Sequence, residues 1–182
     1  MSCEPLAADI VELAPFRERP QVLKALAARR GLTLPATGWS ATARDTLLVS
    51  VRPERWLLLT APAAPGAALA AWRASCTGCA AAIELSAGLA ALYLTGPAVR
   101  EVLARGCRLD LHPEVFVPGS AAATSMAQVA VTLALLPRGW LLLTPATTVQ
   151  HLREWLATAA RPFGFAARGG ATVASLSGER AS

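Results

Sequence analysis

The sequence predicts an α+β fold in which one ferredoxin-like unit, with the order β-α-β-β-α-β, is present twice. The main observation is a repeated motif: residues 56–60 and 140–144 both read Trp-Leu-Leu-Leu-Thr. A second tryptophan follows each motif, Trp72 after 16 positions and Trp155 after 15. A turn precedes each motif, and an apolar run precedes each turn. A repeat of this length indicates a duplicated domain, and the order of its elements is the split β-α-β of ferredoxin-like folds.

The first copy is expected over about residues 8–86. It begins with a short strand at residues 10–13, and Pro20 and Gly31 mark the start and the end of a helix. The rest of this copy is a loop at 31–43, a hairpin of strands 46–51 and 55–60, a helix at 66–75 and a strand at 80–85.

The second copy is expected over about residues 90–168. Its elements are a strand at 91–95, a helix between Pro97 and Gly106, a loop at 107–124, a hairpin of 129–136 and 140–144, and a helix at 148–159. The last strand is either 163–167 or 171–175, and the pattern does not decide between them. Residues 1–168 are therefore expected to form a single duplicated domain. Residues 169–182, rich in Gly, Ala and Ser, are expected to form a flexible tail.

The two Trp-Leu-Leu-Leu runs are expected to be core strands. A strand buried on both faces loses the alternation of polar and apolar residues and becomes a continuous apolar run. Both runs are therefore interpreted as elements of stability rather than of chemistry.

Composition excludes several classes of partner. The chain has 182 residues and a formal net charge of +5, but its arginines are scattered and only one Tyr and four Phe are present. Nucleic-acid binding, which uses basic patches and stacking aromatics, is not expected. No continuous apolar stretch of about 20 residues is found, so no membrane association is expected. The first residues lack the pattern of a secretory signal, so a cytoplasmic location is expected.

Charged residues make up only 16% of the chain, against a usual share of about 25%. Two explanations stay open. The coding sequence can be biased toward Ala and Arg, or part of the apolar surface can be covered by a partner chain.

Residues of the kind that carry catalysis or bind metal are few. Cys76 and Cys79 form a lone CxxC pair, which lacks the second pair of ligands that a zinc site needs and follows a helix instead of opening one. The sequence contains two His, no GxSxG elbow and no glycine-rich phosphate loop. We therefore predict no catalytic, cofactor-binding or metal-binding residue in this chain, and a structural role for the cysteines.

The loop at 107–124 is the main difference between the copies. Gly31 lies 25 positions before Trp56, whereas Gly106 lies 34 positions before Trp140, so the second loop is nine residues longer. Such insertions usually lie on the surface and carry specialisation. The loop combines charged with apolar residues, which is typical of an interface. The predicted interface residues are Arg108, Asp110, Leu111, His112 and Phe116.

Phe116 is the candidate anchor of this interface, since buried aromatic residues dominate binding energy. The alternative is that Phe116 only pins the loop to the chain's own core.

A long segment resembles a known family. Residues 94–113 read Leu-Thr-Gly-Pro-Ala-Val-Arg-Glu-Val-Leu-Ala-Arg-Gly-Cys-Arg-Leu-Asp-Leu-His-Pro, and Phe-Val-Pro-Gly follows at 116–119. This segment resembles the central motif of the gamma subunit of heterotetrameric sarcosine oxidase. The stretch Val-Arg-Pro-Glu-Arg-Trp-Leu-Leu at 51–58 is similar to that family's Gly-Pro-Asp-Glu-Trp-Leu-Leu, although Arg52 replaces the glycine.

The resemblance implies a fold related to the folate-binding domain of the glycine cleavage T-protein. It also implies an accessory chain without its own cofactor, in a complex that oxidatively demethylates sarcosine. The implied partners are alpha and beta subunits, which would hold FAD, FMN, NAD and tetrahydrofolate. No catalytic residue is transferred, because the shared motif is not a catalytic one.

The alternative function is a free-standing tetrahydrofolate-binding protein or one-carbon transferase. A folate pocket needs a buried carboxylate for the pterin ring and a basic residue for the glutamate tail. Glu84 is the candidate carboxylate, because it lies in an apolar predicted strand.

Overall fold

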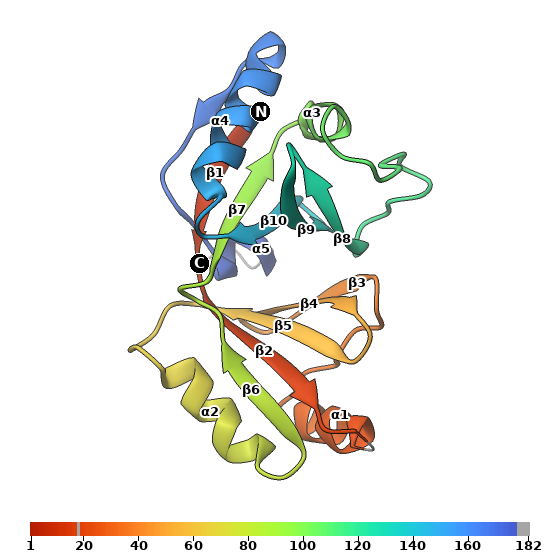
Figure 1. The fold of residues 1–182 in the computed structure, drawn as a ribbon, viewed down its shortest axis with the longest axis vertical. Helices are drawn as coiled ribbons and strands as arrows, with labels where there is room; N and C mark the ends of the chain where they lie inside the picture. The colour runs from red at the N-terminus through yellow and green to blue at the C-terminus, as the bar shows by residue number, and fades with distance from the viewer. Residues whose placement is uncertain (18, 178–182) are drawn as a thin grey trace.

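A computed structural model describes residues 1–17 and 19–177 and has a mixed α+β architecture, as predicted (Figure 1). The five-stranded sheet and its helices consist of β2 (Asp9–Pro15), α1 (Pro20–Arg29), β3 (Trp39–Ala43), β4 (Thr46–Arg52), β5 (Arg55–Thr60), α2 (Ala67–Cys76) and β6 (Ala80–Glu84). The seven-stranded sheet contains β1 (Ser2–Ala7), β7 (Leu89–Thr95), β8 (Ala121–Met126), β9 (Val129–Leu136), β10 (Gly139–Pro145), β11 (Ala166–Ala167) and β12 (Ala171–Thr172). Its helices are α3 (Val99–Ala104), α4 (Val149–Ala160), a 3-10 turn at Arg161–Phe163 and α5 (Val173–Ser177).

The strand orders of the two sheets correspond. The five-stranded sheet has the order β3-β4-β5-β2-β6, and the seven-stranded sheet contains β8-β9-β10-β7-β1. Neighbours in both series are antiparallel, including the hairpins β4–β5 and β9–β10. In the seven-stranded sheet β1 therefore pairs with β7 in the same way that β6 pairs with β2 in the five-stranded sheet.

The elements stack in four layers, with helices outside and the two sheets facing each other (Figure 1). One core lies between the sheets, and one lies between each sheet and its helices. Side chains of a strand alternate between its two faces. Trp56 and Leu58 accordingly enter the core under α1 and α2, while Leu57 and Leu59 enter the core between the sheets.

The second motif follows the same rule. Trp140 and Leu142 face the helices, and Leu141 and Leu143 face the other sheet. The helices complete these cores with residues at helical spacing, such as Leu152 and Leu156 in α4. Among the described residues, no helix has the length and apolar character needed to cross a membrane.

Each loop that the sequence predicted before a hairpin contains an edge strand. The predicted loop at 31–43 ends in β3, and the predicted loop at 107–124 contains most of β8. Both strands consist largely of Ala, Ser and Thr, and many of their residues are only partly buried. Short residues at an edge give no apolar run for a sequence pattern to detect.

The end of the chain also differs from the prediction. The two candidate last strands are reduced to the short strands β11 and β12, and both pair in parallel with β1. In the segment 171–177, Ala171, Val173 and Leu176 enter the core between the sheets. This packing differs from the flexible tail expected for 169–182, whose last part, 178–182, lies outside the described residues.

Gly139 is required by a close approach of two strands. A Cβ atom at this position would lie 2.5 Å from the carbonyl oxygen of Leu94 and 2.8 Å from the ring of Tyr93. Backbone atoms cannot swing away as a flexible side chain can. Any side chain at position 139 therefore pushes β10 away from β7, next to Trp140.

We expect Gly139→Ala to lower the free energy of unfolding by about 1–3 kcal/mol, the usual cost of overpacking. Thermal unfolding measures this loss of stability, because each kcal/mol lowers the Tm of a chain of this size by about 2–4 °C. Gly169→Ala is the matched control, because a Cβ at Gly169 meets no heavy atom within 4 Å. An equal Tm for both variants would contradict the close approach.

Candidate docking site

Arg100 of α3 holds the long loop of the second copy against the core. Its guanidinium donates hydrogen bonds to the carbonyl oxygens of Leu111 and Phe116. The same guanidinium lies 5.0 Å from the centre of the Trp140 ring. The Phe116 ring stacks on Trp140 with centroids 5.6 Å apart and an interplanar angle of 10°. The second tryptophan motif therefore positions the loop as well as the core.

Hydrogen bonds within the loop give it a fixed shape. The Asp110 carboxylate accepts the backbone N–H of His112 at 2.8 Å, and the carbonyl oxygen of His112 accepts the N–H of Phe116 at 2.8 Å. The N–H of Gly119 then donates to the carbonyl oxygen of Leu135 at 2.7 Å. Such turns organise the backbone before any partner binds.

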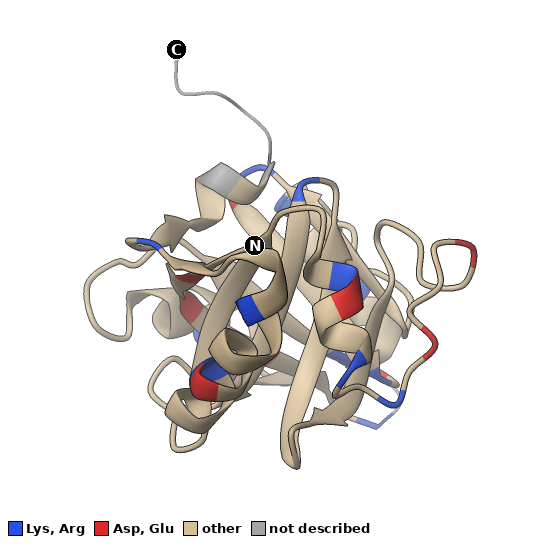
Figure 2. Ribbon diagram, turned by 90° about the horizontal axis from the view of Figure 1, so that it is seen from above, with Lys and Arg blue, Asp and Glu red and all other residues tan. Residues whose placement is uncertain are grey.

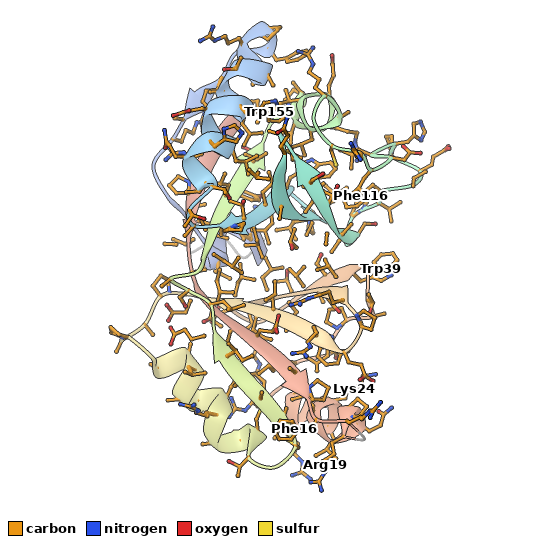
Figure 3. The ribbon with its side chains drawn as sticks, viewed as in Figure 1. Phe16, Arg19, Lys24, Trp39, Phe116 and Trp155 are labelled. Carbon is orange, nitrogen blue, oxygen red and sulfur yellow. The ribbon has the colours of Figure 1, made fainter. Side chains whose placement is uncertain are left out.

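The predicted interface residues separate into two groups. Arg108, Asp110 and His112 are exposed. Leu111 and Phe116 are only 4% and 6% exposed and belong to the core under α3 and α4, which favours the alternative in which Phe116 pins the loop to the chain's own core (Figure 3). The physical reason is the stack on Trp140, which a sequence pattern does not reveal.

Val115 takes the place of Phe116 as the apolar residue that the loop presents, since 59% of it is exposed. A groove of about 520 Å³ lies between α3 and the loop. Its lining combines apolar with charged residues: Pro97, Arg100, Glu101, Ala104, Leu109, Asp110, Leu111, His112 and Pro113. The loop as an interface stays a prediction.

The structure also contains a buried carboxylate that the sequence analysis missed. Glu12 of β2 is 6% exposed and forms ion pairs with Arg52 and with Arg55, the latter at 3.3 Å. These residues line a pocket of about 240 Å³ at the border of the core between the sheets. The available signal was a glutamate inside the apolar strand at 10–13.

Glu84, the predicted carboxylate of a folate pocket, is exposed. One of its carboxylate oxygens accepts a hydrogen bond from the Ser86 hydroxyl at 3.2 Å. Glu84 is the last residue of β6, an edge strand, and therefore does not enter the core.

The CxxC pair lies inside the core under α1 and α2. Cys76 and Cys79 are 1% and 5% exposed and pack with Trp72. Burial, with a smaller contribution from Cys79, raises the pKa of the Cys76 thiol above its ordinary value. Within residues 1–17 and 19–177, no group of three or more His, Cys, Asp or Glu side chains is placed to hold a metal ion.

We expect Phe116→Ala to lower the free energy of unfolding by about 3–5 kcal/mol, because it opens a cavity beside Trp140. The control Val115→Ala removes an exposed side chain from the same loop and should change stability by less than about 0.5 kcal/mol. Denaturant titration of both variants measures the difference. A stable Phe116→Ala chain would mean that the ring does not belong to the core.

Thiol alkylation of the native chain at pH 8 tests the burial of the cysteines. Burial raises the pKa of Cys3 to about 11, so its thiol stays protonated at pH 8 and is a poor nucleophile. We expect slow modification of Cys3 and Cys76, and faster modification of the partly exposed Cys107, with all four thiols reacting after denaturation. Rapid modification of Cys76 in the folded chain would contradict its position in the core.

Comparison with known proteins assigns the chain to a family. Residues 18–161 match the sequence profile described as "Sarcosine oxidase, gamma subunit family". Over 82 residues the chain is 37% identical to the sarcosine oxidase subunit gamma of Corynebacterium sp. (strain U-96) and 37% identical to that of an Arthrobacter species. Each of these matches spans 44% of this chain and 40% of the relative's length.

Solved structures agree with this assignment. The chain superposes on a chain of the heterotetrameric sarcosine oxidase from Corynebacterium sp. U-96, crystallised with pyrrole 2-carboxylate, with a TM-score of 0.74 and 26% identity. That match covers 99% of this chain and 87% of the other. The glycine cleavage aminomethyltransferase T of Bartonella henselae has a similar fold at a TM-score of 0.66 and 16% identity, over 93% of this chain and 47% of that one. Because the profile covers most of the chain and the fold agrees over nearly all of it, the protein belongs to the sarcosine oxidase gamma subunit family.

Proposed function

We propose that the chain is the accessory gamma subunit of a heterotetrameric sarcosine oxidase complex that oxidatively demethylates sarcosine. The observation that carries the proposal is the match over 99% of this chain to a chain of such an enzyme. The family profile, which covers residues 18–161, supports it independently of the fold. The proposed location is the cytoplasm.

The chemistry of the complex is assigned to partner chains. The proposed partners are the alpha and beta subunits, which would bind FAD, FMN, NAD and tetrahydrofolate. The proposed role of this chain is to help assemble the complex. The part of the long loop before β8, residues 107–118, is one proposed contact, because it presents the exposed Val115 together with the exposed polar residues Arg108, Asp110, His112 and Glu114. An apolar centre within a charged rim is typical of subunit interfaces.

The architecture behind this role is proposed to be a pair of ferredoxin-like halves, about residues 8–86 and 90–168, in one domain. The corresponding strand orders of the two sheets support this proposal. So do the positions of the two motif tryptophans, since Trp56 pairs with Leu13 of β2 and Trp140 with Leu94 of β7. Beside the second half lies β1, which comes from the start of the chain.

A folate-binding function is the second candidate, and Glu12 is the residue that would serve it. Glu12 is buried and lies beside two arginines, which provides both groups that a folate pocket needs. Two observations weigh against it. Both carboxylate oxygens already accept hydrogen bonds from Arg52 and Arg55, and about 240 Å³ is below the usual 300–1,000 Å³ of small-molecule pockets.

Expression of the complex with and without this chain tests the accessory role. We expect the isolated chain to show no sarcosine-dependent oxygen consumption. We expect the alpha and beta subunits to assemble and remain active only in its presence. Equal assembly, stability and turnover without the chain would contradict the proposal.

Calorimetric titration of the isolated chain with tetrahydrofolate separates the two candidates. The accessory role predicts no saturable heat. Binding that Glu12→Gln abolishes would favour the folate-binding candidate.

A further inference from the structure

The net positive charge of the protein is concentrated in one layer. Residues 16–36 and 61–79, which contain α1, α2 and their flanking segments, are named the α1–α2 layer. The layer contains six basic residues and a single acidic one, Glu18, which lies outside the described residues. The basic residues are Arg17, Arg19, Lys24, Arg29, Arg30 and Arg73. The rest of the chain has equal numbers of acidic and basic residues, so the formal net charge of +5 arises in this layer.

Within the part of the chain that the structure describes, ion pairs leave this charge unneutralised. No ion pair among the described residues involves a basic residue of the layer. Arg30 lies over Trp72 and Arg19 donates to the carbonyl oxygen of Gly78, so these two also have structural roles. At the opposite end of the molecule, where α3 and α4 lie, acidic and basic residues are intermixed (Figure 2). Arg105 at that end forms an ion pair with Glu101.

Exposed apolar residues lie within the same layer. Phe16 and Val22 are each 49% exposed. Phe16, Arg19 and Lys24 lie together at the end of the molecule where α1 begins (Figure 3). A half-exposed aromatic at a basic end of a protein is costly in water, and it is typical of a site that another molecule covers.

The outer faces of α2 and α4 differ sharply, although each helix follows a Trp-Leu-Leu-Leu strand. The exposed residues of α4 are Gln150, His151, Arg153, Glu154 and Thr158. The exposed residues of α2 are Ala67, Ala70, Ala71, Arg73 and Ala74. A helix that faces water normally carries polar residues on its outer face. The outer face of α4 fits that rule, whereas four of the five exposed residues of α2 are alanine.

We propose that the α1–α2 layer docks against an acidic face of a partner subunit. This inference rests on the proposed function and adds the surface and the charge of the partner. Guanidinium groups pair with carboxylates in a planar, directional manner, which suits a protein surface of opposite charge. The exposed alanines let a partner helix or strand approach closely, and Phe16 supplies an apolar contact at the border of the layer.

Two other polyanions fit the layer less well. Helices that lie on membranes present Trp, Phe and Leu to the lipid, whereas the outer face of α2 presents alanine. Single-stranded nucleic acid is usually bound on several aromatic side chains, and Phe16 is the single exposed aromatic among the described residues of the layer.

The α1–α2 layer and the loop at 107–118 lie at different ends of the molecule (Figure 1). One gamma chain can therefore contact two neighbours at the same time.

Charge reversal with a matched control tests the proposal in the co-expressed complex. The layer variant is Arg17→Glu, Lys24→Glu and Arg73→Glu, three exposed residues without a described side-chain bond. The control variant, Arg138→Glu, Arg153→Glu and Arg161→Glu, changes the net charge equally on the seven-stranded side. Both should keep the wild-type Tm within a few degrees. We expect the layer variant to weaken association at least about 100-fold at low salt, and the control to change it by less than about 3-fold.

The outcomes distinguish the two proposals. If the wild-type chain forms no complex with alpha and beta subunits, the proposed function and this inference both fail. If it forms a complex in which layer and control variants bind alike, the docking surface is wrong and the proposed function stands. If the layer variant binds the subunits normally but loses binding to phosphatidylserine vesicles or to single-stranded RNA, a different polyanion is the partner and the inference is overturned.

Discussion

The fold depends on β5 and β10, because the side chains of each strand serve two cores at once. Trp56 and Leu58 pack under the helices while Leu57 and Leu59 pack between the sheets, and β10 repeats this arrangement. Each buried leucine contributes roughly 1.5–3 kcal/mol. With both faces apolar, hydrophobicity alone does not decide which residue faces which core.

The tryptophans determine which face of each strand is directed toward the helices, which the leucines alone do not. The indole N–H of Trp56 donates to the carbonyl oxygen of Pro35 at 2.8 Å, which fixes this ring on the helix side. Trp140 is held by the Phe116 ring and the Arg100 guanidinium. A slip by one residue would break these contacts and place an indole between the sheets. The same rings therefore set the register of the strands and position the loops before them.

The two sheets are also joined outside their cores, so the chain forms one body. The strands β1 and β2 are adjacent in sequence but belong to different sheets. At the edges formed by β3 and β8, Trp39, the first residue of β3, forms a β-bridge with Ser120, which directly precedes β8, and the N–H of Ser40 donates to the carbonyl oxygen of Gly119 at 2.7 Å. The crossing of the chain from β1 to β2 and the bridge between β3 and the start of β8 restrict relative motion of the halves. Residues on distant surfaces thus keep a fixed spacing.

The sequence predicted those parts of the fold that leave a local pattern. The Trp-Leu-Leu-Leu runs and Pro20 gave the central strands and the start of α1. The position of β1 was not predictable, because its pairing with β7 joins residues about ninety positions apart and leaves no periodic signal. The sequence left open whether Phe116 packs inside the chain or on a partner for a similar reason, since its stacking partner Trp140 lies in another element. The burial of Glu12 was missed because its two arginine partners lie about forty residues away in the sequence, on the hairpin β4–β5.

The two copies are alike inside and different outside, and this difference indicates where function lies. The helix-side cores of the two copies use the same strand motif and the same layer order. We interpret these shared interior features as contributions to stability in each copy. The longer loop and the basic layer have no counterpart in the other copy, and both lie on the surface. Glu12, the most buried carboxylate among the described residues, is already paired with two arginines and is not free to act on a substrate. A rigid body with unlike surfaces at its two ends suits the proposed role of joining unlike partner chains.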